Sequence, residues 1–180
     1  MALKPFAAFI RAIGPETHRV MPLAKLCEAC VGLGLVGAKS HIASGNLLFH
    51  SSCEAAHAAR LVEQAISQFG LKCPVFIREA GDLETIIAGN PFPDAARDRP
   101  SRLSISLFDE DLEPELAAAL MAWPGPERIV VRARCVYVDY TAGQGTSKIA
   151  PPVLERRLKR TGTARNWNTI VKMRALLAGM

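Results

Sequence analysis

The chain has 180 residues, of which 49% are hydrophobic and 22% are charged, and its formal net charge is +5 at pH 7. This length and balance fit one compact domain or two small ones and exclude a disordered chain. No apolar run approaches the ~18 residues of a membrane helix, and the run at 6–10 is too short for a signal peptide. We therefore expect a cytoplasmic protein with no membrane partner.

Charge is unevenly distributed along the chain. Residues 128–180 hold eleven Lys and Arg side chains against two acidic ones, a local charge of +9, whereas residues 1–127 carry −4. A basic end on a nearly neutral body favours an anionic partner. The five cysteines are odd in number and scattered, so free thiols are expected rather than a disulfide framework.

Hydrophobic periodicity over the first 80 residues predicts a strand-helix-strand-strand-helix-strand order, which is the ferredoxin-like plait. Ser51 followed by Glu54 matches a capping box and predicts that the second helix starts there. The expected elements are a strand at 6–13, a helix at 22–31, a hairpin of strands at 38–43 and 46–50, a helix at 51–69 and a strand at 74–78.

The second half repeats this pattern after a short helix at 82–89 and a linker at 90–102 that contains three prolines. We therefore expect an α+β protein of two ferredoxin-like (alpha-beta plait) subdomains with an extra C-terminal helix. The predicted limits are 1–80 and 103–180, with helix and linker at 81–102. The expected later elements are a strand at 103–107, a helix at 111–123, a hairpin at 127–132 and 135–140, a helix at 151–160, a short strand at 163–165 and a helix at 167–178.

Four local strings occur together in the order and spacing of one bacterial family: Ile42-Ala-Ser-Gly-Asn-Leu-Leu-Phe49, Asn90-Pro-Phe-Pro93, Ser147-Lys148 and Thr163-Ala-Arg-Asn-Trp-Asn-Thr-Ile170. Along essentially its whole length the chain resembles this family, which is catalogued as domain of unknown function 1697. The resemblance implies the two-subdomain plait and brings no activity.

The chain departs from that family after its first strand. Family members continue with Arg-Gly-Ile-Asn-Val-Gly-Gly, whereas this chain has Arg11-Ala-Ile-Gly-Pro-Glu-Thr17. Glycine allows another group to approach the backbone closely, so a role that depends on the family's loop glycines does not carry over to the loop at 12–17.

A loop with two glycines, Gly143-Gln-Gly-Thr-Ser-Lys148, lies between a predicted strand and a predicted helix. Its backbone N–H groups, with the hydroxyl group of Ser147 and the ammonium group of Lys148, can hold a phosphate or carboxylate. The Gly-Lys-Ser/Thr order of a P-loop is missing. The alternative is an ordinary flexible turn with a solvated lysine.

The string Arg165-Asn-Trp-Asn168 precedes the last predicted helix. Asn166 can cap that helix by accepting hydrogen bonds from its first N–H groups, and Trp167 can anchor it in the core. The alternative is an anion site, because a helix N-terminus beside an arginine attracts negative charge. This alternative gives a role to Arg165 and Asn168, which the capping explanation does not.

Ser44, Gly45 and Asn46 form the predicted turn of the first hairpin, and Arg11 ends the first strand. Turn chemistry accounts for the first three residues. Arg11 either extends into solvent or pairs at the sheet edge. The alternative is a ligand site beside the hairpin, lined by Arg11, Ser44 and Asn46, because loops often carry function.

Basic side chains gather on the predicted helix at 151–160 and on the hairpin before it. Charge runs on helices are usually solvated, but this set can also follow a phosphate backbone. Aromatic residues make up only 6% of the chain, which argues against sequence-specific RNA readout by stacking. The candidate basic surface consists of Arg128, Arg132, Arg134, Arg156, Arg157, Lys159 and Arg160.

No metal and no cofactor is expected. Cys27 and Cys30 lie on the apolar stripe of a predicted helix without further ligands, which favours core positions. His50, Cys53 and His57 are close in sequence but lack a fourth ligand. No catalytic triad or pair of acids is recognisable.

The leading hypothesis is a binding module for an anionic partner, either nucleic acid or a phosphorylated small molecule, in which Lys148, Arg165 and the basic surface make the contacts. The alternative is an enzyme acting on a small anionic substrate in a cleft between the two subdomains, because many polar candidates fall in loops. An interaction or scaffold protein is the third hypothesis. The sequence does not define the ligand, the reaction or the oligomeric state. The residues assigned to the enzyme hypothesis are Arg11, Asn46, Ser147, Lys148, Arg165 and Asn168.

Overall fold

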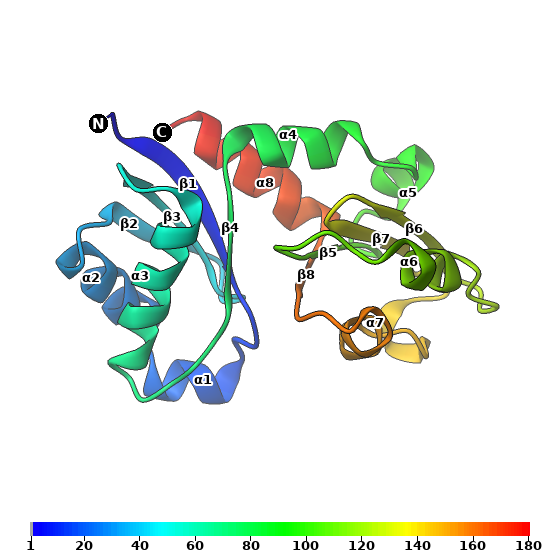
Figure 1. Ribbon diagram of the computed structural model, residues 1–180, viewed down its shortest axis with the longest axis horizontal. Helices are drawn as coiled ribbons and strands as arrows, with labels where there is room; N and C mark the ends of the chain where they lie inside the picture. The colour runs from blue at the N-terminus through cyan, green and yellow to red at the C-terminus, as the bar shows by residue number, and fades with distance from the viewer. Residues whose placement is uncertain (1) are drawn as a thin grey trace. The chain divides into compact units, whose positions relative to one another are not determined.

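The computed structural model describes residues 2–180, and this part of the chain divides into two compact units (Figure 1). Unit 1 holds the chain up to Glu84 together with Met173–Met180, and unit 2 holds Thr85–Lys172. Each unit contains one four-stranded sheet and a hydrophobic core. The domain limits expected from the sequence stay a prediction, because compactness does not test independent folding.

Unit 1 is a ferredoxin-like plait whose sheet has the strand order β2-β3-β1-β4, with all neighbours antiparallel. Helices α2 and α3 contact each other and cover one face of this sheet (Figure 1). The elements are β1 (Lys4–Ile10), α1 (Pro15–Val20), α2 (Leu23–Gly32), β2 (Val36–His41), β3 (Asn46–Ser51), α3 (Ala55–Ser67) and β4 (Val75–Arg78).

The core of unit 1 follows from strand and helix periodicity. Alternate residues of β1, Phe6, Ala8 and Ile10, point to the face under the helices and are fully buried. Helix α3 meets them with Val62 and Ile66, one turn apart on its apolar stripe. Burying an aliphatic or aromatic side chain of this size contributes roughly 1.5–3 kcal/mol, so this seam holds the plait together.

Unit 2 repeats the same topology with the strand order β6-β7-β5-β8, again antiparallel throughout. Helices α6 and α7 contact each other over the core (Figure 1). The elements are α4 (Ala80–Ala88, begun in unit 1), α5 (Pro93–Asp98), β5 (Leu103–Leu107), α6 (Pro114–Met121), β6 (Arg128–Arg132), β7 (Cys135–Asp139), the 3-10 turn η1 (Gln144–Thr146), α7 (Pro151–Leu158), β8 (Thr163–Asn166) and α8 (Trp167–Ala178, ending in unit 1).

An ion cluster joins α5 to the sheet of unit 2. The fully buried carboxylate of Asp139, at the end of β7, accepts hydrogen bonds from Arg99 at 2.6 and 2.9 Å. Arg128 on β6 donates to the same carboxylate at 2.6 and 2.8 Å, and Asp94 on α5 accepts from both arginines. A buried charge is tolerated only when it is paired in this way.

The structure confirms the α+β fold with two ferredoxin-like plaits and the additional C-terminal helix. Two short helices, α1 and α5, lie in segments where none was expected, each with a proline in its first turn. The capping box at Ser51 and Glu54 is wrong. Ser51 still pairs with Lys4 as part of β3, and helix α3 begins only at Ala55.

Candidate functional site

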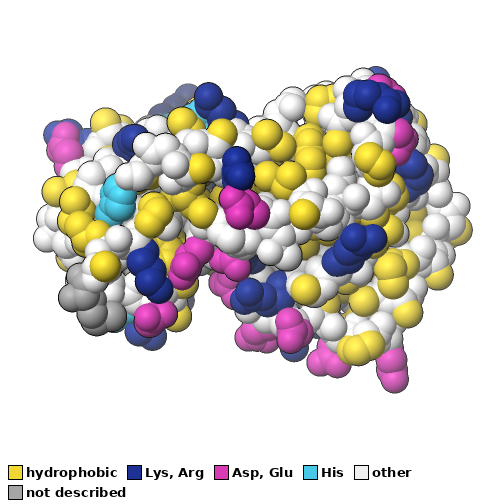
Figure 2. Space-filling view, turned by 90° about the horizontal axis from the view of Figure 1, so that it is seen from above, with side chains coloured by type: hydrophobic (Ala, Val, Ile, Leu, Met, Phe, Trp, Pro, Cys, Tyr) yellow, Lys and Arg dark blue, Asp and Glu magenta, His cyan; other side chains and the backbone are white. Residues whose placement is uncertain are grey.

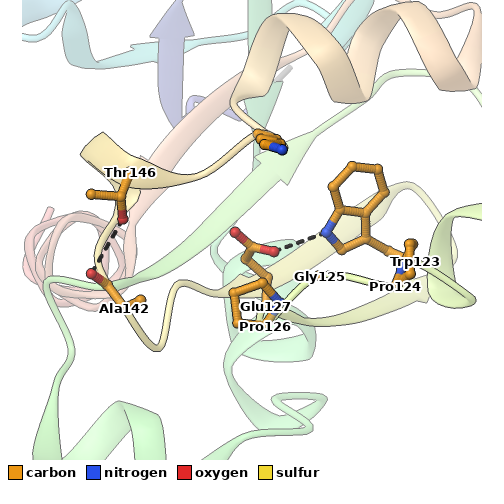
Figure 3. A pocket seen from close by; sticks show the side chains of 8 residues that line it. Trp123, Pro124, Gly125, Pro126, Glu127, Ala142 and Thr146 are labelled. Atoms are coloured by element: carbon orange, nitrogen blue, oxygen red, sulfur yellow. Dashed lines mark hydrogen bonds between the residues drawn. The ribbon is translucent and has the colours of Figure 1, made fainter.

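A cavity of about 430 Å³ opens in unit 2 between two loops, the α6–β6 loop (residues 122–127) and the β7–α7 loop (residues 140–150) (Figure 3). We call it the loop pocket. In the plait these two loops lie at the same end of the sheet, which is why they meet. The pocket is lined by Trp123, Pro124, Gly125, Pro126, Glu127, Ala142, Thr146 and Lys148.

The α6–β6 loop is shaped by its Pro-Gly-Pro sequence. Pro124 and Pro126 each fix one backbone angle and lack an N–H group, so the helix cannot continue. Gly125 between them leaves room for its neighbours, because a Cβ atom there would collide with Trp123 Nε1 and Glu127 Oε2. The turn thereby brings Glu127 back against the indole ring of Trp123.

Glu127 ties the two loops together. The indole Nε1 of Trp123 donates to its Oε2 at 2.8 Å (Figure 3), and the hydroxyl group of Ser147 donates to its Oε1. Ser147 Oγ also accepts from the N–H group of Ile149 at 3.0 Å. Burial raises the pKa of Glu127, but the hydrogen bonds from Ser147 and Trp123 outweigh it and hold that pKa below its usual value. The pocket therefore contains an ionised carboxylate at neutral pH.

Two cations accompany this carboxylate. The guanidinium carbon of Arg157, an exposed residue of α7, lies 4.8 Å from the centroid of the Trp123 ring, which is a cation–π contact. Lys148 lines the pocket, and its side chain is exposed. The loop pocket thus combines an aromatic ring, a carboxylate and the charge of Lys148, and Arg157 lies against the aromatic ring.

The β7–α7 loop is held by its own hydrogen bonds. Tyr140 Oη donates to the carbonyl group of Ile149 at 3.0 Å, which closes the base of the loop. At its tip Gly143 has a φ of 98°, a conformation that side chains disfavour. The hydroxyl group of Thr146 lies within hydrogen-bonding distance of the carbonyl oxygen of Ala142 (Figure 3) and of that of Gly143, to which it donates in a bifurcated bond. These bonds position Ser147 and Lys148 at the pocket.

Two of the sequence candidates at the start of α8, Asn166 and Arg165, make hydrogen bonds within unit 2, and a ligand role for these candidates stays a prediction. Asn166 Oδ1 accepts from the N–H group of Thr169 at 2.9 Å, so Asn166 caps the helix as the capping explanation predicted. Arg165 is 9% exposed and donates to Thr163 Oγ1 and to the carbonyl group of Ala164. Burial lowers the pKa of Arg165 to about 10. Asn168 is exposed in the first turn.

The candidates near the first hairpin lie in unit 1. Asn46 is fully buried, and its amide group donates to Ser44 Oγ at 3.0 Å and to the carbonyl group of His41 at 3.2 Å. Ser44 and Asn46 therefore shape the turn. The backbone N–H group of Arg11 donates to the carbonyl group of Pro74, and its side-chain charge acts on Cys73.

Two of the seven arginine and lysine residues of the predicted basic surface, Arg128 and Arg160, form ion pairs inside unit 2. Arg128 belongs to the Asp139 cluster, and Arg160 pairs with Glu110 at 3.0 Å. Arg132 and Arg134 donate to the carbonyl groups of Gly89 and Asp109. Figure 2 shows one face of the molecule, on which Lys and Arg side chains stand beside Asp and Glu side chains. The exposed members of the set are Arg132, Arg134, Arg156, Arg157 and Lys159.

A second cavity, of about 540 Å³, lies in unit 1 where α3 leads into β4, and its lining contains Cys73 and Glu63. Burial raises the pKa of the Cys73 thiol, and the nearby charge of Arg11 only partly offsets this. A thiol with a raised pKa is a weak nucleophile at neutral pH. Among residues 2–180, no three His, Cys, Asp or Glu side chains lie together as a metal site requires.

Sequence reasoning found Ser147 and Lys148 but missed Trp123 and Glu127. The helix expected at 111–123 ends earlier, because α6 ends at Met121, and the indole ring of Trp123 both packs against the core of unit 2 and reaches the pocket. The signal was the Pro-Gly-Pro turn that follows Trp123, since two prolines end a helix and turn the chain back.

The fold and the site define an α+β protein of two ferredoxin-like plaits, of which the second carries a loop-lined pocket. Among residues 2–180, no helix has the length and apolar character to cross a membrane. The chain belongs to the family described as "Protein of unknown function (DUF1697)", whose profile matches residues 3–137, so the resemblance seen in the sequence is confirmed. The matched range includes Trp123 and Glu127 and ends before Lys148.

A solved structure is similar to the whole chain. It is that of the conserved bacterial protein SP0830 from Streptococcus pneumoniae, with 19% sequence identity and a TM-score of 0.75. The match covers 98% of this chain and 99% of that protein, and at this identity it concerns the fold alone. A comparison with curated proteins gives no match.

Proposed function

We propose that this chain is a binding module for a small phosphorylated ligand and that the loop pocket of unit 2 is its site. The observation that carries the proposal is a cavity lined by Lys148 and by the Trp123 ring, against which Arg157 lies. Its volume of about 430 Å³ falls in the range of small-molecule sites, roughly 300–1,000 Å³.

A small ligand is favoured over nucleic acid by the state of the other cations. A nucleic-acid surface needs several free cations along a path, because each neutralised phosphate adds to the affinity. Arg128 and Arg160 are instead paired with carboxylates of unit 2 itself. Lys148 is a compact charge with several N–H donors, suited to one phosphate group, and the exposed Arg157 can give a second contact.

Isothermal titration calorimetry with pyrophosphate, ribose 5-phosphate and GMP tests the proposal. We expect at least one of these probes to bind, and we expect Lys148→Ala to weaken it by about tenfold or more, the size of one charge-assisted hydrogen bond. The matched control is Arg156→Ala, which removes an exposed cation of α7 that does not line the pocket. Its affinity should stay within about twofold of the unmodified protein.

Two outcomes overturn the proposal. One is that none of the three probes binds at low salt, and the other is that Lys148→Ala binds as tightly as the unmodified protein. A labelled single-stranded RNA serves as the competing partner. RNA binding that depends on Arg156 and not on Lys148 would assign the anionic partner to nucleic acid on the surface of α7. The hypothesis of an enzyme stays a prediction, since no contact among the described residues adds to it.

A further inference from the structure

The carboxylate of Glu127 would repel an anionic ligand in the loop pocket. It is ionised, it lines the cavity, and it carries the same sign of charge as the ligand. Its oxygens accept hydrogen bonds from Trp123 and from Ser147. A carboxylate oxygen can accept more than one hydrogen bond, so Glu127 keeps acceptor capacity in the pocket. A ligand that fits must offer N–H or O–H donors here as well as a phosphate group for Lys148.

Trp123 adds a flat surface at the same place. Its indole ring lines the pocket, and the hydrogen bond to Glu127 and the space left by Gly125 fix its orientation. The guanidinium group of Arg157 already lies against the ring, 4.8 Å from its centroid. Because that arginine is exposed, a planar ligand ring can take its place or stack with it. The ligand should therefore have a flat ring, N–H donors along one edge of that ring, and a phosphate group. A nucleotide has all three.

The base can be chosen by its hydrogen-bonding edge. Guanine presents two adjacent donors, N1–H and the N2 amino group, which together suit one carboxylate. Adenine and cytosine each place a ring-nitrogen acceptor beside their amino group, and uracil places its N–H group between two carbonyl oxygens. In each of these three bases, an acceptor atom would face the carboxylate of Glu127, and the two would repel each other. Bases held in protein pockets are read in this way, by stacking and by bonds to the Watson–Crick edge.

We infer that the loop pocket takes a guanine mononucleotide, with the base on Trp123, its N1 and N2 donors on Glu127 and its phosphate group at Lys148. This inference rests on the proposed function and names the ligand of the same site. It makes Glu127 the residue that selects the base, Trp123 the residue that adds affinity for any base, and Lys148 the residue that holds the phosphate group.

The test compares GMP, AMP and ribose 5-phosphate by calorimetry on the unmodified protein and three variants. We expect GMP to bind about tenfold or more tightly than AMP, the size of one charge-assisted hydrogen bond. Glu127→Gln keeps an acceptor for Trp123 but replaces one oxygen with a donor, so the preference should fall to about threefold or less. The matched control is Glu115→Gln, the same change at an exposed site on α6. The ratio of two affinities is insensitive to a partly unfolded sample, so the comparison holds even if a variant is less stable.

Trp123→Leu separates stacking from the phosphate contact. It should weaken GMP and AMP alike by about tenfold, the size of one stacked base, and leave ribose 5-phosphate unchanged. Fluorescence gives an independent signal because the chain has two tryptophans. GMP should quench the emission of Trp123 in the unmodified protein, and Trp123→Leu, which keeps only the buried Trp167, should show no quenching.

Equal affinity for GMP and AMP, or a GMP preference that Glu127→Gln leaves intact, overturns the assignment of guanine. Ribose 5-phosphate binding as tightly as GMP overturns the nucleotide, and the proposed function then survives through its dependence on Lys148. Failure of GMP, AMP and ribose 5-phosphate overturns the nucleotide, and failure of pyrophosphate as well overturns the proposed function.

Discussion

The two units have the same order of strands and helices but join them with loops of different length. In unit 1 the α2–β2 connection (33–35) and the β3–α3 connection (52–54) have three residues each. The corresponding loops of unit 2 have six residues (122–127) and eleven (140–150). The loop pocket forms between these two longer loops, whereas the cavity of unit 1 lies elsewhere, where α3 leads into β4. The same plait thus has short loops at this end in unit 1 and long loops at the corresponding end in unit 2. Binding and catalytic residues are often found in such longer loops.

The largest difference between the units is expected at the last residue of the third strand. Asp139 in β7 and Ser51 in β3 hold equivalent positions, each opposite the first residue of the first strand. Asp139→Asn should destabilise the protein by about 3 kcal/mol, because Arg99 and Arg128 lose a buried counter-charge. Ser51→Ala should lose about 1 kcal/mol, the value of one hydrogen bond.

Urea unfolding at pH 7 measures both losses, and hydrogen exchange locates each in its own sheet. Asp98→Asn is the control for Asp139→Asn, since it breaks an exposed pair with Arg97 and should leave stability nearly unchanged. Equal losses for Asp139→Asn and Ser51→Ala would show that the ion cluster adds nothing beyond an ordinary hydrogen bond.

A pH dependence follows from the same cluster and should be confined to unit 2. Hydrogen bonds from Arg128 and Arg99 lower the pKa of Asp94 to about 2. Burial raises the pKa of Asp139, but hydrogen bonds from the same arginines outweigh it and lower that pKa overall. Both carboxyl groups therefore have a lower pKa in the folded protein than the value of about 4 expected in the unfolded chain. Their contribution to the stability of the folded state is complete above about pH 4 and is lost as the pH falls through the folded pKa values.

The measurement is hydrogen exchange of each sheet in a series of buffers of decreasing pH. Amide groups of β6 and β7 should lose protection below about pH 4, where protons begin to compete with the arginines. In Asp139→Asn this pH dependence should become shallower, because one of the titrating groups is gone. A loss of protection that begins in β1 and β3 would contradict the assignment to unit 2.

Glycine is needed for different reasons in two corresponding loops, the α2–β2 connection of unit 1 and the α6–β6 loop of unit 2. Gly34, in the α2–β2 connection, has a φ of 92° and open space around it, so Gly34→Ala should lose about 1–2 kcal/mol through backbone strain. Gly125, in the α6–β6 loop, has no positive φ but stands against Trp123 and Glu127. Gly125→Ala should lose about 1 kcal/mol, chiefly through the Trp123–Glu127 hydrogen bond.

Tryptophan fluorescence distinguishes these two causes. Gly125→Ala displaces the indole ring and should shift the emission of Trp123, whereas Gly34→Ala should leave the spectrum unchanged and lower only the urea midpoint. An unchanged spectrum in Gly125→Ala would mean that the ring position does not depend on the space at this glycine.

How far the sequence predicted these features depends on the range of the interactions. The strands and main helices of both plaits follow from periodicities within single segments, and the structure confirms them. Ser147 and Lys148 could be singled out as candidates because a glycine-rich loop is a local signal. The contact of Glu127 with Ser147 joins residues 20 positions apart, and that of Arg128 with Asp139 joins residues 11 positions apart. Local patterns do not encode such pairs, so the pocket and the ion cluster needed the structure.

The smallest expected difference concerns how helices begin in the two units. Asn166 caps α8 with a hydrogen bond to the N–H group of Thr169, while Glu54 at the start of α3 makes no such side-chain bond. Asn166→Ala should therefore lose about 1 kcal/mol, and Glu54→Ala should stay within about 0.5 kcal/mol of the unmodified protein. Replacing Glu54 with Ser should stabilise α3, because the hydroxyl group can accept from a free N–H group that the longer glutamate leaves unbonded. Urea unfolding measures all three variants, and a loss in Glu54→Ala as large as that in Asn166→Ala would mean that the start of α3 is held by its side chain after all.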